Sequence, residues 1–502
     1  MLAVKPGGRG PLLRAVATAA VLGAIAWLLP QARHRVMHAL VTYDAAPSEP
    51  ATFPESPEGP PLPPTTRVRV ILVDGLAAET ARALPGWSAV CNRGTRLTVD
   101  VGFPTVSLPV EAALWSGLTQ QQTGIVFRSD HPLETPLAGI PAQVPGSRAV
   151  AEDHGYIVRS LGFATVEPAA DPKSPAKDAD PAAWSAQWLA HAHDAVASDA
   201  RLVFVHVLRV DTAGHRFGRD APEYWTVAGV ADALLEALVA TAPDARWFLL
   251  SDHGHIATGG HGGEERDVRH VEACIAGPGV AVADRAPLVH VVDIARAIAD
   301  STGATLDRAA RGRPLGVAMA HPLDDDQAVP KLPFGRSAVA LAVLVIGSLV
   351  TWWTARRWWL GPWWFAIGAI SLLVVRGDPT LSMPMVYAPS GRAMFLTWLP
   401  ALAIAIGVTW RGLGVTTLGR VVVAQLAAPV AALAAALTVC GAWSVLVGAE
   451  TAPAVPHVTA WLSPLLLIVG HGAAAVALAV LGRSVRSAFD RPSRAETPRT
   501  AI

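Results

Sequence analysis

Six aspartates and histidines in the middle of the chain have the residue types and the order of a metal-binding set. They are Asp74, Asp211, His215, Asp252, His253 and His261. Three carboxylates and three imidazoles would be costly to gather without cations, because like charges repel and charged groups bury poorly. Two divalent ions would turn this repulsion into attraction. The set therefore predicts a site for two metal ions.

Each of the three aspartates follows an apolar run typical of a β-strand. Asp74 follows Arg-Val-Arg-Val-Ile-Leu-Val, Asp211 comes shortly after Leu-Val-Phe-Val-His-Val, and Asp252 follows Trp-Phe-Leu-Leu-Ser. These short runs alternate with amphipathic helical stretches, which predicts an α/β fold. Ligands of open α/β sheets bind beyond the carboxyl ends of the strands, so three strands should deliver carboxylates to one edge.

The three histidines extend this pattern. His215 stands four residues after Asp211, and His253 follows Asp252 directly. His261 lies within Gly-Gly-His-Gly-Gly, where glycines let the backbone approach a ligand closely. A single aspartate after a strand is more often a helix cap, and a single histidine is more often a satisfied polar group. The compound motif, with all its segments in this order, favours the metal site over these separate interpretations.

The expected nucleophile is a hydroxyl between the first two of these segments. Thr105 lies in Gly-Phe-Pro-Thr-Val-Ser-Leu-Pro, just before an apolar helical stretch that ends near Gly117. Pro109 suits the first turn of that helix. A phosphate on Thr105 would meet the free N–H groups at the start of the helix. A simple N-cap is the alternative role for Thr105, and Ser107 is the rival nucleophile.

The composition of the whole chain places much of it in lipid. Of 502 residues, 52% are hydrophobic and only 16% are charged, against roughly 25% charged in soluble domains. Mean hydropathy is +0.37. A purely soluble enzyme is therefore excluded. Lysine plus arginine equal aspartate plus glutamate, 40 against 40, so no charge excess favours a nucleic-acid polymer as a partner.

Changes in composition divide the chain into five predicted segments. The apolar run from Leu12 to Leu29 suits a signal peptide or a membrane anchor, and its length, close to the roughly 20 residues that span a bilayer, favours the anchor. The prolines Pro60, Pro61, Pro63 and Pro64 are typical of a semi-rigid spacer. The predicted segments are an anchor (1–36), a proline-rich linker (37–66), a catalytic domain (67–326), a five-helix transmembrane region (327–482) and a basic cytoplasmic tail (483–502).

Five apolar stretches form the predicted transmembrane region. They run from about Ala338 to Trp353, Trp358 to Val375, Ala393 to Trp410, Val421 to Val447 and Val458 to Leu481. Arginines near membrane segments tend to stay cytoplasmic, and Arg356, Arg411 and Arg483 fall on one face if the stretches alternate. We therefore expect a multi-pass protein of the cell membrane, with its catalytic domain on the extracytoplasmic face.

The three cysteines are too few for a disulfide framework. Cys440 lies inside an apolar run, which leaves Cys91 and Cys274 as the only plausible pair. Spacing along the chain does not show whether these two meet. We interpret them as two small buried residues.

The segments from about Val68 to Leu315 resemble the alkaline phosphatase superfamily. The strand-Asp-Gly opening and the Phe-Pro-Thr turn are similar to its type I phosphodiesterase/nucleotide pyrophosphatase branch. Pro-Thr-x-x-x-Pro, Ser-Asp-His-Gly followed by Gly-x-His-Gly, and the order of anchor, external domain and spans resemble the GPI ethanolamine phosphate transferases. The resemblance implies an α/β alkaline-phosphatase-like catalytic domain with a central, mainly parallel sheet, joined to an α-helical transmembrane region.

The resemblance also implies how the ligands divide between two divalent metal ions. One ion would be held by Asp211, His215 and His261. The other would be held by Asp74, Asp252, His253 and the deprotonated Thr105. Ligation by aspartate and histidine suits zinc best, with manganese as the alternative.

Two positions separate the chain from related patterns. Thr-Gly-Ile stands at Thr123 where His-Gly-Ile is common in the phosphodiesterases. The resemblance implies that this position is not a metal ligand, so we expect the departure to affect substrate contacts rather than the core chemistry. Sulfatases need arginine two residues after the proline of their C/S-x-P-x-R motif, but Glu111 stands there after Ser107-x-Pro109-x. Sulfatase activity is therefore disfavoured.

These inferences predict a membrane-anchored, metal-dependent phosphodiester hydrolase that acts through a phosphothreonine at Thr105. Its expected partners are the membrane and a phosphodiester that can be lipid-linked, but no nucleic-acid polymer. The alternative is a phosphoethanolamine-type phosphotransferase with a lipid or glycan acceptor. Water resolves the intermediate in the first case and an acceptor alcohol in the second. A non-enzymatic membrane scaffold is a third hypothesis, but every expected ligand position is filled.

Overall fold

The computed structural model describes the catalytic region and a few flanking helical residues. The described residues are 58–125, 132–169, 181–257, 259–263, 265–283 and 285–324, with helical pieces within 13–28 and 477–486. The predicted linker up to residue 57, and the transmembrane region and tail apart from those C-terminal pieces, lie outside them. The anchor is described only at scattered helical positions. The transmembrane arrangement therefore stays a prediction.

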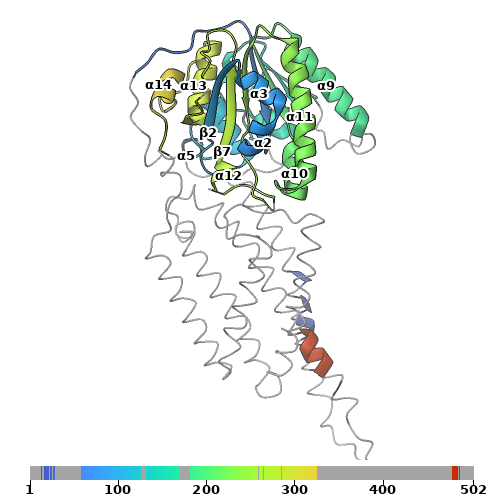
Figure 1. Ribbon diagram of the computed structural model, residues 1–502. Helices are drawn as coiled ribbons and strands as arrows, with labels where there is room; N and C mark the ends of the chain where they lie inside the picture. The colour runs from blue at the N-terminus through green and yellow to red at the C-terminus, as the bar shows by residue number, and fades with distance from the viewer. Residues whose placement is uncertain are drawn as a thin grey trace, which may run out of the picture.

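The described domain is built on an eight-stranded sheet in the order β4-β3-β5-β1-β6-β7-β2-β8 (Figure 1). β7 pairs antiparallel with both of its neighbours, and every other pairing is parallel. The predicted α/β fold with a mainly parallel sheet is confirmed. The strands are β1 (Val68–Val73), β2 (Gly94–Asp100), β3 (Arg148–Ala151), β4 (Thr165–Glu167), β5 (Leu202–Val207), β6 (Arg246–Leu250), β7 (His270–Ala276) and β8 (Leu288–His290).

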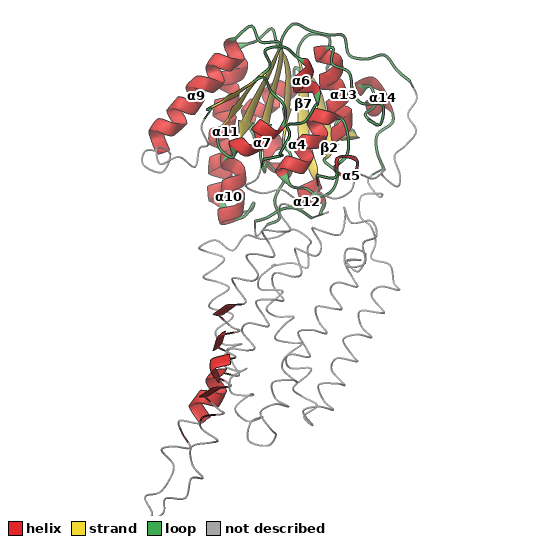
Figure 2. Cartoon of the chain, turned by 180° about the vertical axis from the view of Figure 1, so that it is seen from behind, coloured by secondary structure: helices red, strands yellow, loops and turns green. Residues whose placement is uncertain are grey.

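Helices cover both faces of the sheet (Figures 1 and 2). On one face lie α2 (Ala78–Ala83), α3 (Pro85–Cys91), α9 (Pro181–Ala197), α10 (Arg209–Phe217) and α11 (Pro222–Thr241). On the other lie α4 (Ser107–Ser116), α6 (Ile140–Gln143), α7 (Gly155–Ser160), α13 (Val291–Thr302) and α14 (Leu315–Ala320). The short helices α5 (Gln120–Thr123) and α12 (Arg266–Arg269) complete the described set.

The central strands are buried along their whole length. β1, β5 and β6 have no exposed position, as expected for parallel strands covered on both faces. Alternate side chains serve two cores. Val70 and Leu72 of β1 pack towards α4 and α13, whereas Ile71 and Val73 pack towards α11. This frame fixes the carboxyl ends of the three strands at one edge.

One described helix is long and apolar enough, by length and composition alone, to cross a membrane. It is α11, with a mean hydropathy of 1.2. Its side chains Tyr224, Ala228, Leu235 and Leu238 are buried in the core on that face of the sheet. The criterion is met, but α11 is a packed element of this domain.

The end of the proline-rich segment lies against the domain. Leu62 N–H donates a hydrogen bond to Asp300 Oδ2, and Thr65 N–H donates to the carbonyl of Ser301. The guanidinium of Arg246, which is almost fully buried, donates to the carbonyl of Pro63. Residues 58–66 are therefore part of the folded domain rather than a free spacer.

Cys91 and Cys274 form a disulfide between α3 and β7, with a Cα–Cα distance of 5.0 Å. The interpretation of these residues as two separate buried thiols is therefore wrong, although the pair is the one that the sequence left open. Helix α3 packs directly on β7, which brings Cys91 against the strand. Disulfides persist in oxidising compartments and are rare in reducing ones.

Candidate metal centre

Asp74 and Asp252 stand side by side at the carboxyl edge of the sheet. β1 and β6 are parallel neighbours with Leu72 opposite Leu250, so the two aspartates leave the strands at the same level. The backbone N–H of Asp74 donates to the carbonyl of Val207 on β5, the other neighbour of β1. The sheet register alone therefore brings these two carboxylates together, as the sequence predicted.

The first group of ligands gathers around His253. Its Nε2 lies 3.4 Å from Asp74 Oδ1 and 3.2 Å from Asp252 Oδ2. The same nitrogen lies 3.3 Å from the Ser107 hydroxyl oxygen. His253 Nδ1 lies 3.1 Å from the carbonyl of Gly254 and can donate to it, which leaves Nε2 free as a ligand. Two carboxylates, an imidazole and a hydroxyl thus converge on one point.

The second group gathers around Asp211. Its Oδ1 lies 3.3 Å from His215 Nε2, one turn further along α10, and 3.7 Å from His261 Nε2. The Nε2 atoms of His215 and His261 are 3.0 Å apart. The rings of His253 and His261 stack with centroids 3.6 Å apart, so the two groups are adjacent. All six predicted Asp and His ligands therefore lie in one place.

His255 is a member of the second group that the sequence analysis missed. It is fully buried, and its Nε2 lies 3.1 Å from Asp211 Oδ1. Its Nδ1 accepts a hydrogen bond from Gly260 N–H. A Cβ on Gly214 would lie 2.3 Å from the ring, so this glycine makes room for it. The only sequence signal was a second histidine two residues after His253.

The carboxyl groups of the two ligand groups have pKa values shifted in opposite directions. Burial raises those of the first group. It raises the pKa of Asp74 well above its ordinary value and that of Asp252 to about 6, and neighbouring aspartates add to both shifts. Burial opposes ionisation of Asp211 as well, but His215, His255 and His261 outweigh it and hold the pKa of Asp211 well below its ordinary value.

Burial also favours the neutral form of three imidazoles of the site, those of His253, His255 and His261. It lowers the pKa of His253 to about 3 and that of His255 to about 4. Burial, reinforced by His253 and His215, lowers the pKa of His261 well below its ordinary value. Neutral imidazole is the form that binds a metal ion.

Several buried atoms of the site have no hydrogen-bond partner among the described residues. Both carboxylate oxygens of Asp74, Oδ2 of Asp252 and Nδ1 of His215 are among them. A buried carboxylate without a partner is costly unless it coordinates a cation or takes up a proton. The donor set Asp74, Asp252 and His253 and the separate donor set Asp211, His215 and His255 each lie within 4.8 Å and could hold an ion. The residues present therefore fit two divalent cations.

The two candidate hydroxyls face different neighbours. Thr105 is fully buried; its hydroxyl donates to the carbonyl of Gly263 and accepts from Gly262 N–H, both at 2.9 Å. Its backbone carbonyl is 2.7 Å from His261 Nδ1. Ser107 is half-buried at the first residue of α4, and its hydroxyl faces His253 Nε2. The geometry therefore brings Ser107, rather than Thr105, to the first ligand group.

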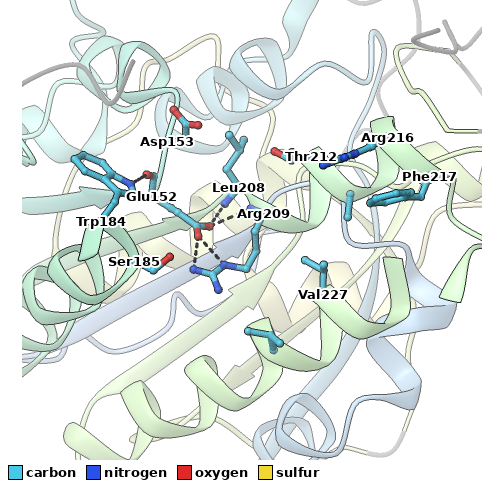
Figure 3. Close-up of a pocket in the computed structure, with 12 residues that line it drawn as sticks. Glu152, Asp153, Trp184, Ser185, Leu208, Arg209, Thr212, Arg216, Phe217 and Val227 are labelled. Atoms are coloured by element: carbon cyan, nitrogen blue, oxygen red, sulfur yellow. Dashed lines mark hydrogen bonds and ion pairs between the residues drawn. The ribbon is translucent and has the colours of Figure 1, made fainter. Parts of the chain in front are cut away.

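A separate cavity of about 560 Å³ lies between α9, α10 and α11 (Figure 3). Trp184, Phe217 and Val227 line it, as do Glu152 and Arg209, and Glu152 accepts hydrogen bonds from Arg209. Its α10 residues Ala213 and Phe217 lie on the opposite side of that helix from Asp211 and His215, because successive positions turn by about 100°. The cavity is thus separated from the metal centre by α10.

Part of the chain matches a known protein family. Residues 153–307 match the family model for type I phosphodiesterase / nucleotide pyrophosphatase. This segment holds Asp211, His215, Asp252, His253 and His261. The resemblance to the type I phosphodiesterases is confirmed. No curated protein matches the sequence.

Solved structures of the alkaline phosphatase superfamily are similar to parts of this chain, at low sequence identity. Murine ectonucleotide pyrophosphatase / phosphodiesterase 5 is 16% identical over 38% of this chain and 57% of its own, with a TM-score of 0.29. The human counterpart is 13% identical over 51% of this chain and 100% of its own, at 0.41. A superfamily protein from Vibrio parahaemolyticus is 14% identical over 59% of this chain and 79% of its own, at 0.38. Scores this low carry no argument about activity.

Proposed function

We propose that this domain hydrolyses phosphodiesters with the help of two divalent metal ions, on the extracytoplasmic face of a membrane. The observation that carries the proposal is the pair of adjacent ligand groups with a serine hydroxyl aimed into one of them. The match to the type I phosphodiesterase family supports phosphodiester chemistry. Zinc suits the aspartate and histidine ligands best, and manganese is the alternative.

In this proposal we assign the ligands to the two ions as the sequence suggested, with one change at the nucleophile. Asp211, His215 and His261 would hold one ion. Asp74, Asp252 and His253 would hold the other, with Ser107 in the place first expected for Thr105. When bound, the two ions supply positive charge that stabilises the attacking and leaving oxygens of the displacement.

The residues of the chain then position the reacting groups. Ser107 Oγ attacks phosphorus, an Oγ–P bond forms, and the P–O bond to the leaving alcohol breaks. The leaving oxygen takes up a proton in exchange for the one that the serine loses, and water later cleaves the Oγ–P bond. Ser107 begins α4, whose free N–H groups and positive dipole end favour the negative phosphoryl group. Hydrogen bonds from Gly262 and to Gly263 hold Thr105 against the loop that carries His261.

The proposed compartment is supported by the disulfide. An oxidised Cys91–Cys274 pair suits the extracytoplasmic side, which the arginine asymmetry of the sequence also favours. A substrate anchored in the same membrane follows from the predicted spans and belongs to the proposal.

Intact-mass measurement after incubation with an activated diester tests the nucleophile. Ser107→Ala should abolish the phosphorylated species, whereas Thr105→Ala should retain a detectable one. Thr105→Val is a matched control, because it removes the hydroxyl and keeps the shape. A phosphoenzyme that survives Ser107→Ala and disappears in both Thr105 variants would return the role to Thr105. Turnover that depends on an added acceptor alcohol would identify a transferase instead.

A further inference from the structure

A buried pair, His206 and Glu111, extends the first ligand group into the core. His206 lies on β5 and Glu111 on α4, and both side chains are fully buried. His206 Nε2 lies 3.2 Å from Asp74 Oδ2 and 3.2 Å from Glu111 Oε1. One imidazole nitrogen therefore stands between a predicted ligand and a second carboxylate.

His206 and Glu111 occupy core positions where two apolar side chains would be buried at a lower cost in free energy. Strand alternation puts His206 on the same face of β5 as Leu202 and Phe204, in the core beneath α4. Glu111 is four residues after Ser107, so the two side chains project from the same side of α4. A carboxylate buried there costs several kcal/mol unless it is paired. The only ion-pair partner of Glu111 among the described residues is His206.

His206 lies beside one oxygen of the Asp74 carboxylate. One oxygen of that carboxylate, Oδ2, faces His206, while the other, Oδ1, faces His253 Nε2 at 3.4 Å. Groups that hold the ligands of a metal ion from behind typically change its affinity by about 10- to 100-fold. The Asp74 carboxylate accepts no hydrogen bond of standard geometry among the described residues, and the imidazole beside its Oδ2 is that of His206.

We propose that His206, held in place by Glu111, is a positioning residue that orients the Asp74 carboxylate towards the ion of the first ligand group. The inference rests on the proposed two-ion function. The pair also connects Asp74 to α4, the helix that carries Ser107, because Glu111 and Ser107 lie on the same side of that helix. His206 and Glu111 are fully buried, and their proposed effect passes through Asp74 rather than through contact with the substrate.

Zinc binding by the full chain tests the proposal without any assay of turnover. Two backgrounds isolate the ions: Asp211→Ala leaves the ion of the Asp74 group, and Asp252→Ala leaves the other. In the Asp211→Ala background, His206→Leu should weaken zinc binding about 10- to 100-fold. In the Asp252→Ala background the same change should leave the affinity unaltered. The second background is the matched control.

Two further variants separate orientation from simple packing. His206→Gln keeps an N–H near the position of Nε2 and should rescue most of the lost affinity. Glu111→Gln keeps the shape and should produce a smaller loss in the same direction and at the same ion. Thermal unfolding of the metal-free proteins identifies any variant that fails to fold.

Three results would overturn the proposal. One is equal weakening in both backgrounds, and another is equal loss for His206→Gln and His206→Leu. The third is a wild-type chain that binds three zinc ions, one of which is lost with His206, because Asp74, Glu111 and His206 would then be ligands themselves. A chain that shows the expected zinc behaviour but hydrolyses no diester would contradict the proposed function and leave this inference standing.

Discussion

The two ligand groups of the centre balance their charges in opposite ways. The first combines Asp74, Asp252 and His253, all fully buried. Burial raises the pKa of both carboxyl groups, so without a cation both take up protons more readily than exposed aspartates do. The second surrounds one carboxylate, Asp211, with histidines, and the side chains of Asp211 and His215 are 13% and 16% exposed. The first group therefore requires its cation far more than the second does.

Each group also has one buried histidine behind its carboxylate. His206 lies beside Asp74 and His255 lies beside Asp211. His206 has a carboxylate, Glu111, on its other side, whereas the Nδ1 of His255 accepts from a backbone N–H. The first group is thus connected through His206 to a further carboxylate, whereas the histidine behind the second group contacts only a neutral backbone N–H on that side.

The largest expected effect is the loss of turnover when either carboxylate is neutralised. Asp252→Asn and Asp211→Asn should each reduce kcat by about 10³-fold or more, because each removes charge stabilisation worth several kcal/mol. Steady-state hydrolysis of an activated diester measures this loss, with Asp244→Asn, on the surface, as a control. If one variant kept near wild-type turnover, the two groups would not both be catalytic.

The fold was largely predictable because strand periodicity survives in a single sequence. The apolar runs before Asp74 and Asp252 identify buried parallel strands, and the sheet edge then brings these two carboxylates together. The reversed direction of β7 has no such signal, because its run is buried like that of its neighbours.

Side-chain partners across the fold were not predictable. His206 occupies a regular inward position of a strand, and nothing nearby in the sequence indicates that Glu111 packs against it. The choice between Thr105 and Ser107 depends on where α4 begins, since a shift of two residues turns a side chain by about 200°. The Cys91–Cys274 bridge likewise needs the packing of α3 on β7.

The second expected effect concerns the stability of the metal-free protein at pH 8. Neutralising Asp252 should raise this stability, whereas neutralising Asp211 should lower it. The pKa of Asp252 is about 6 in the folded chain, above its ordinary 3.8, so its stabilising contribution is present at low pH and lost as pH rises through 6. Metal-free Asp252→Asn should therefore be more stable than wild type at pH 8, by about 3 kcal/mol, because each pKa unit is worth about 1.4 kcal/mol. The difference should vanish below about pH 4.

Asp211 should behave in the reverse manner. Its pKa is lowered in the folded chain, chiefly by His215 once the opposing burial is overcome, so its contribution is present above the ordinary value and lost as pH falls. Metal-free Asp211→Asn should therefore be less stable than wild type at pH 8. Urea unfolding at pH 4 and pH 8 with a strong chelator measures both differences. Equal signs at pH 8 would remove the contrast between the two groups.

The smallest expected effect concerns His255 and sharpens the comparison at the second group. His255→Ala should weaken the ion held by Asp211, His215 and His261 by about tenfold, because Asp211 loses the imidazole that fixes its Oδ1. His255→Gln keeps a nitrogen near Nε2 and should weaken it less. Zinc titration in the Asp252→Ala background isolates this ion, and the Asp211→Ala background is the control. A loss far above 100-fold would make His255 a ligand in its own right, and the second group would then hold its ion with one carboxylate and three imidazoles.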